Sequence, residues 1–224
     1  MTQIDHEIQE IKDELIELWE LVNSQLVKAN TALVTVDKDL AREIIAAEKK
    51  VNSLELKLER NSENVIALFN PVAMDLRFIL AVLKINTNLE RTADIAAGLA
   101  KFIKETEEKF DKNLIEEVRI KEMFDIAISM MENTLISFDQ EDSKSARLIL
   151  KSDESLDKIN KKSNKIIAEY CRNNPDNIEF ALYVLNCIRK LERVGDQAKN
   201  MAEEVIFFIE AKVLRHKNIK KNKK

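Results

Sequence analysis

Residues 89–94 read Leu-Glu-Arg-Thr-Ala-Asp, and residues 191–196 read Leu-Glu-Arg-Val-Gly-Asp. Residues four apart share a face of an α-helix, so each copy of Leu-Glu-Arg-x-x-Asp directs a glutamate and an aspartate to the same side. Two carboxylates this close repel each other unless solvent, a base or a cation intervenes. The repetition predicts a duplicated helical chain that carries the same acidic pair in each half.

The composition predicts an all-α fold. Among 224 residues there are only two glycines and two prolines, so turns are scarce and the elements must be few and long. The hydrophobic fraction of 45% is sufficient for a core, which excludes a disordered chain. The net charge of −4, with basic and acidic residues interspersed, gives no support for nucleic-acid binding.

Apolar spacing and capping residues divide the chain into six predicted helices. The first carries an apolar stripe from Ile4 to Val22, and the others are expected over about 37–59, 70–104, 111–138, 139–170 and 174–215. Asn70-Pro71 and Asn174-Pro175 each predict a helix start, because Asn caps helices and Pro fits their first turn. Residues 61–64, Asn-Ser-Glu-Asn, are expected to weaken the second helix.

The three predicted helices of the second half repeat those of the first. Pro71 precedes its motif by nearly the same distance as Pro175 does, and Ala41-Arg42 matches Ala146-Arg147. The sequence therefore predicts two tandem three-helix bundles, over 1–108 and 109–216, in an elongated molecule. The remaining basic tail, 217–224, is expected to be disordered, and the alternative for it is weak attraction to an anionic membrane surface.

A second acidic pair precedes the motif in the second half. Asp153 and Asp157 are four residues apart, whereas Glu48 and Asn52 hold the matching positions in the first half. Antiparallel helices could bring Asp153 and Asp157 beside the second motif and gather four carboxylates. Such a group suits an oxygen-preferring cation, such as Mg²⁺, Mn²⁺ or iron. The alternative is an acidic stripe that is simply solvated.

Other site chemistries lack their residues. His6 and His216 lie at the two ends and are expected to be solvated, so zinc and ferritin-like di-iron sites lack ligands. There is no Gly-rich phosphate loop and no visible nucleophile with a paired base, so an enzyme is not expected. Cys171 and Cys187 are expected to be buried free thiols, and Trp19 a core or interface residue.

The duplicated motif, the Asp75-Leu76-Arg77 segment after Met74, and six helices in about 220 residues resemble the PhoU family of bacteria. Its members are phosphate-transport accessory and regulatory proteins. The resemblance implies a cytoplasmic, non-enzymatic and often dimeric adaptor that represses phosphate-starvation genes. Its implied partners are a phosphate ABC transporter, through the ATPase subunit, and a sensor histidine kinase. An acidic N-terminus and the lack of a long apolar run agree with a cytoplasmic location.

The resemblance also implies metal ligands, because family members can carry multinuclear iron or other metal clusters on Glu/Asp-x-x-x-Asp motifs. The implied ligands are Glu90, Asp94, Glu192, Asp196, Asp153 and Asp157, with Glu48 and Asn200 as further candidates. The family often has Asn four residues after the motif aspartate, as at Asn200, but the first half has Gly98 there. We therefore expect the second half to hold metal more firmly. The alternative function is a structural or scaffolding bundle without metal.

Overall fold

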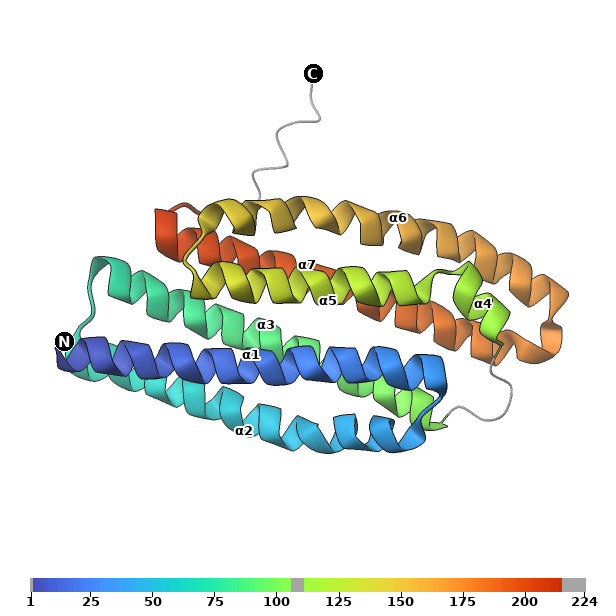
Figure 1. Cartoon of the computed structure of the whole chain (residues 1–224), viewed down its shortest axis with the longest axis horizontal. Coiled ribbons are helices and arrows are strands. Elements are labelled where there is room, and N and C mark those ends of the chain that lie inside the picture. Colours follow the sequence, from blue (N-terminus) through green and yellow to red (C-terminus); the bar gives the residue numbers. More distant parts are fainter. Residues whose placement is uncertain (1, 106–110, 215–224) are drawn as a thin grey trace, which may run out of the picture.

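The computed structural model describes residues 2–105 and 111–214, and every regular element in these ranges is helical. In chain order the helices are α1 (Gln3–Thr35), α2 (Lys38–Phe69), α3 (Ala73–Glu105), α4 (Lys112–Glu117), α5 (Ile120–Asp139), α6 (Ser143–Asn173), the 3-10 helix η1 (Pro175–Asn177) and α7 (Ile178–Glu210). The prediction of an all-α fold is confirmed. Helices α1 to α3 form the first lobe and α5 to α7 the second, and the two lobes lie side by side in an elongated molecule (Figure 1).

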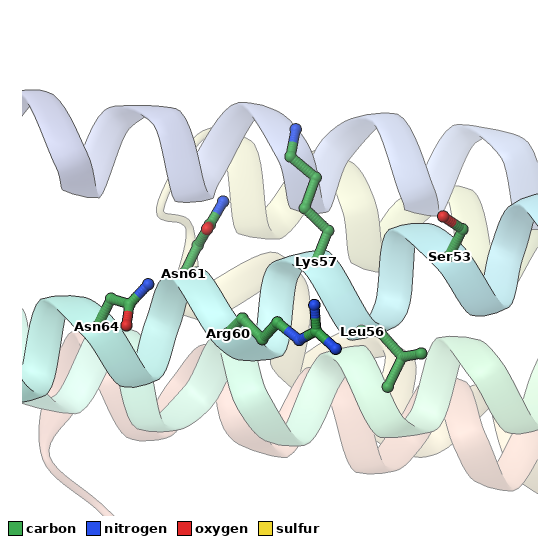
Figure 2. Close-up of a pocket in the computed structure, with 6 residues that line it drawn as sticks. All are labelled: Ser53, Leu56, Lys57, Arg60, Asn61 and Asn64. Atoms are coloured by element: carbon green, nitrogen blue, oxygen red, sulfur yellow. The ribbon is translucent and has the colours of Figure 1, made fainter.

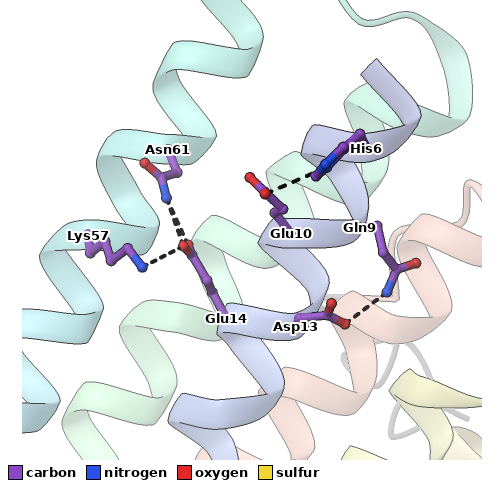
Figure 3. Close-up of polar contacts among 7 residues, drawn as sticks. All are labelled: His6, Gln9, Glu10, Asp13, Glu14, Lys57 and Asn61. Carbon is purple, nitrogen blue, oxygen red and sulfur yellow. Dashed lines mark hydrogen bonds and ion pairs between the residues drawn. The ribbon is translucent and has the colours of Figure 1, made fainter. Parts of the chain in front are cut away.

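Helix α2 continues through the segment that was expected to weaken it. Ser62 is buried, and the Asn61 side-chain amide donates to both carboxylate oxygens of Glu14 on α1, at 3.0 and 2.9 Å. The Lys57 ammonium lies 2.9 Å from the same carboxylate (Figure 3). The prediction was wrong because contacts with α1 outweigh the weak helix propensity of these polar residues.

Two predicted helix starts were wrong by a few residues. Asn70 does not cap α3: it ends α2 in the left-handed conformation, at φ 46°, which Asn tolerates better than most residues. Asp139 is the last residue of α5, and Asp142 caps α6 by accepting hydrogen bonds from the Lys144 and Ser145 amides at 2.9 and 3.3 Å. Asp142, three residues after Asp139, therefore caps the helix that the sequence predicted to begin at Asp139.

The fourth predicted helix is broken in two. Helix α4 ends at Glu117, and Arg119, with φ 58°, re-aims the chain before α5 begins. Asp111 caps α4 and accepts a hydrogen bond from the Tyr170 hydroxyl at 2.8 Å, which ties this short helix to the end of α6. The last predicted helix also ends early, since α7 stops at Glu210.

The lobes share one core. Four aromatic side chains, one each from α1, α3, α5 and α7, meet with ring centroids 5.7–6.0 Å apart: Trp19, Phe78, Phe138 and Phe208. Trp19 is fully buried, as predicted. Helices α3 and α7 run antiparallel through the centre of the molecule, so each lobe buries part of its apolar surface against the other.

The remaining expectations concern single residues and the tail. Cys187 is buried, which raises the pKa of its thiol to about 12 and makes it unreactive, whereas Cys171 is only half-buried. His6 is exposed beside Glu10, at 3.6 Å. His216 and the basic tail lie outside the described residues, as does the predicted boundary at 108 and 109. No helix in the described ranges has the length and apolar character needed to cross a membrane.

Candidate functional site

The first copy of the motif lies on α3, where it faces α2. Leu89 is fully buried, Glu90 is half-buried, and Arg91 and Asp94 are exposed. Partial burial raises the pKa of the Glu90 carboxyl, and the negative charges of Asp94 and then Glu55 raise it further. This carboxylate is therefore held in a place that disfavours its own charge.

The neighbour that α2 supplies is Glu55, which sequence reasoning missed. The Asn86 side-chain amide donates to the backbone carbonyl of Glu55 at 3.0 Å, one helical turn before Glu90. Burial, followed by the charge of Glu59, raises the pKa of Glu55 as well. Counting the same number of residues away from the α2–α3 turn along each helix would have placed position 55 near the motif.

Glu48, further toward the start of α2, has a basic partner on α3. Its carboxylate is 3.5 Å from the Lys101 ammonium, seven residues beyond Asp94 and therefore roughly 10 Å further along α3. Asn52 is exposed. Counted from the α2–α3 turn in the same way as Glu55, position 48 is level with Asp94 and position 52 with Glu90. Glu55 is the α2 carboxylate whose charge raises the pKa of Glu90.

The second copy of the motif lies on α7, against α6. Glu192 and Asp196 are both half-buried, as are Asp157 and Asn200. The Arg147 guanidinium lies 2.7 Å from the Glu210 carboxylate and fixes the antiparallel register of α6 and α7. Counting ten residues inward from this ion pair on both helices places Asp157 level with Asn200, one turn from Asp196.

Asp153 lies on α6 one turn before Asp157, and its side chain is outside the described part of the structure. Position 153 is therefore placed only by its backbone. By the same count as for Asp157, this backbone is level with Glu204 on α7.

No three or more His, Cys, Asp or Glu side chains in the described part of the chain are arranged to hold a metal ion together. The donors nevertheless fit a hard cation in their chemistry, because the groups near each motif are carboxylates and amides. Partial burial, followed by the charges of Asp94 and Glu55, disfavours the ionised form of Glu90, and a bound cation would favour that form. In the second lobe, Asp157, Asp196 and Asn200 would hold such an ion.

The missing side chain at Gly98 has a structural explanation. A Cβ at this position would collide with the Lys190 ammonium, which α7 places over α3 one turn beyond Asp94. The first lobe therefore has a cationic side chain where the second lobe has the amide of Asn200. Nothing in the sequence around Gly98 indicated this neighbour, because Lys190 comes from the other lobe.

Two further contacts join the lobes along the α3–α7 seam. Lys84 reaches from α3 to Glu204 on α7, with an ammonium-to-carboxylate distance of 2.9 Å, and its ammonium lies 5.0 Å from the Phe207 ring centroid. Glu204 is 3% exposed. Arg77, from the Asp-Leu-Arg segment, donates its Nε to the Phe208 carbonyl at 3.3 Å. Arg77 thus fastens the start of α3 to the end of α7.

A hollow on the surface of α2 has no comparable chemistry (Figure 2). Lys57 and Asn61 point from it toward α1, where Glu14 pairs with both of them. Its lining is Ser53, Leu56, Lys57, Arg60, Asn61 and Asn64. Because all of these residues come from one helix, we interpret the hollow as a gap between surface side chains.

Comparison with known proteins covers both lobes. A family model described as the PhoU domain matches residues 15–103 and again residues 120–205. The chain belongs to the PhoU family. The two matches fall on the two lobes, which confirms the duplication predicted from the motif.

Relatives with this domain are similar along most of their length. The phosphate-specific transport system accessory protein PhoU homolog 1 of Thermotoga maritima is 31% identical over 204 residues, which cover 91% of this chain and 87% of that protein. The PhoU protein of Escherichia coli is 27% identical, with 96% and 88% covered. The crystal structure of PhoU from Pseudomonas aeruginosa matches with a TM-score of 0.89 at 27% identity and covers 94% of this chain and 100% of that one.

Proposed function

We propose that this chain is a phosphate-specific transport system accessory protein, which restrains phosphate uptake and phosphate-starvation signalling. The observation that carries the proposal is the double PhoU-domain match, one for each lobe, with relatives of that name aligned over nearly their whole length. The PhoU protein of Streptococcus pneumoniae, titled a phosphate transport system regulatory protein, has a TM-score of 0.86 at 26% identity with this chain.

The proposed mode of action is contact, without catalysis. In the cytoplasm the protein would bind the ATPase subunit of a phosphate ABC transporter and a sensor histidine kinase, as a homodimer. Exposed apolar side chains at the α2–α3 turn support a role in protein contacts: Leu68 is 73% exposed, Val72 72% and Met74 57%.

The proposed cofactor is an oxygen-preferring cation, either iron, Mn²⁺ or Mg²⁺, held most firmly in the second lobe. Bound between α6 and α7, it would neutralise Asp157 and Asp196 and fasten the two helices together. Asn200 would add a neutral oxygen, and Glu192 would support the site from one turn away. In the first lobe, Glu90 and Asp94 would form a weaker site.

Deletion of the gene tests the regulatory role. Phosphate-starvation genes should become expressed in phosphate-rich medium, and a plasmid-borne copy should silence them again. Unchanged expression in a strain without a paralogue would refute the proposal. A phosphate ABC transporter operon next to the gene would strengthen it.

A second candidate is a structural or scaffolding bundle whose acidic stripe is solvated and binds no metal. This candidate is supported by the exposure of Asp94, a motif carboxylate that lies open to solvent. Metal analysis of the purified protein, together with the deletion phenotype, separates the two. A metal-free protein whose deletion leaves phosphate-starvation gene expression unchanged would favour the scaffold.

A further inference from the structure

Helix α6 presents a basic ridge along its whole outer side. Nine residues at alternating steps of four and three are all exposed: Lys144, Leu148, Lys151, Ser155, Lys158, Lys162, Lys165, Glu169 and Arg172. Six of them are basic and one is acidic. The ridge extends over about 42 Å, because an α-helix rises 1.5 Å per residue. Helix α6 packs mainly against α5 and α7 and forms one edge of the molecule (Figure 1).

The corresponding ridge of α1 has the opposite charge. Its exposed residues Glu10, Asp13, Glu17 and Glu20 also follow steps of three and four, with no basic residue among them. Helix α1 as a whole has seven acidic and two basic residues, whereas α6 has eight basic and four acidic ones. Helix α5 lies between the two helices, so the protein is charged asymmetrically across its width (Figure 1). An anionic surface would attract the exposed side of α6 and repel the exposed acidic side of α1.

The side chains of the ridge suit a diffuse anionic surface better than a specific acidic partner. Five of the six bases are lysines, which act as mobile point charges, whereas paired recognition of carboxylates relies on the rigid fork of arginine. Leu148, which is 64% exposed on the same ridge, adds an apolar contact.

We infer that the α6 ridge is an electrostatic docking surface for anionic phospholipid headgroups, and that it orients the protein with α6 against the membrane and α1 away from it. This inference goes beyond the proposed function, because it names a lipid surface on a particular helix. Its failure would leave the regulatory proposal standing, since gene deletion tests that proposal without reference to lipid. A protein held this way stays close to a membrane transporter and keeps its other helices accessible.

Vesicle binding by the full chain tests the inference. The ridge variant Lys151→Gln/Lys158→Gln/Lys165→Gln is compared with the control variant Lys38→Gln/Lys49→Gln/Lys50→Gln on α2. Both lose three positive charges, keep the C-terminal tail and change only exposed residues, but α2 lies at the opposite edge of the molecule. Co-sedimentation is measured with phosphatidylcholine vesicles that contain or lack phosphatidylglycerol, at low and physiological ionic strength.

We expect wild type and the α2 variant to bind the phosphatidylglycerol vesicles similarly, with binding weakened by salt and absent without the anionic lipid. The ridge variant should bind about a hundredfold more weakly. Equal losses in both variants would show an effect of net charge alone and would overturn the inference. Full binding by the ridge variant would overturn it too, because the tail or another surface would then carry the contact. No binding of wild type to the phosphatidylglycerol vesicles, even at low ionic strength, would also overturn the inference.

Discussion

The two copies of the motif share a buried leucine but differ in what surrounds their carboxylates. In the first lobe, Glu90 lies near both Asp94 and Glu55 of α2, and the Lys190 ammonium lies over Gly98, one turn beyond Asp94. In the second lobe, Asp196 lies near the level of Asp157 on α6, with Asn200 one turn further. The common part of the motif therefore supports packing, while the charged and amide neighbours of the carboxylates differ between the lobes.

The largest effect is expected at the leucines, where the two lobes should agree. Leu89 and Leu191 are both fully buried, so Leu89→Ala and Leu191→Ala should each lower the free energy of unfolding by about 3 kcal/mol. Urea denaturation measures both values. A much smaller loss for one variant would show that the two copies are not packed equivalently.

The two lobes should differ in how firmly they bind metal. We expect Asp196→Asn to lower the bound metal more than Asp94→Asn does, as measured by elemental analysis after purification. Asp196→Asn should destabilise the protein when metal is present, but it should be neutral or stabilising after chelation, because a repulsive charge has been removed. Equal metal content in wild type and both variants would favour the solvated acidic stripe in both lobes.

The sequence predicted those features that depend on local residues or on repetition. Scarce glycine and proline gave the helical class, the repeated motif gave the two lobes, and the apolar spacing around Trp19 placed it in the core. The break at Arg119 was missed, because its left-handed conformation is not marked by glycine or asparagine. Lys190 was missed because its position over Gly98 depends on how the lobes pack.

The pairing of acidic residues shows the same limit. Matching the two halves by sequence found Glu48, whose carboxylate has a Lys101 partner in the structure, but it did not find Glu55, whose charge acts on Glu90. Residue matching finds equivalent positions, whereas charge partners depend on helix register and on side-chain reach. Arg77 is similar: its segment was noticed in the sequence, but its bond to the Phe208 carbonyl required the fold.

A moderate effect is expected from relieving the repulsion in the first lobe. The pKa of Glu90 is raised from its ordinary value of 4.5 in the folded state, so the folded state holds this proton more tightly than the unfolded state does. The contribution of Glu90 to stability therefore falls as the pH rises from below 4.5 through its folded pKa. Without metal, Glu90→Gln should stabilise the protein by about 0.5 kcal/mol at neutral pH and have no effect at pH values below 4.5.

Urea denaturation of chelated protein across this pH range checks the effect, with Glu63→Gln as an exposed control of the same charge change. The control should leave the pH dependence of wild type unaltered. A Glu90→Gln variant that is less stable than wild type at neutral pH would mean that the carboxylate is held by a favourable partner. The surroundings of Glu90 would then stabilise its negative charge and not repel it.

The smallest effect is expected at Gly98, where the lobes differ by a single side chain. Alanine favours a helix over glycine by about 1 kcal/mol, but its Cβ would displace the Lys190 ammonium. This ammonium is the far end of a flexible side chain, so it can move at small cost. Gly98→Ala should therefore raise the free energy of unfolding by about 0.3 kcal/mol, with an unchanged denaturant slope. A loss of stability would show instead that Lys190 contributes to the first lobe from its present position, and Lys190→Met in the wild-type background should then destabilise the protein to a similar extent.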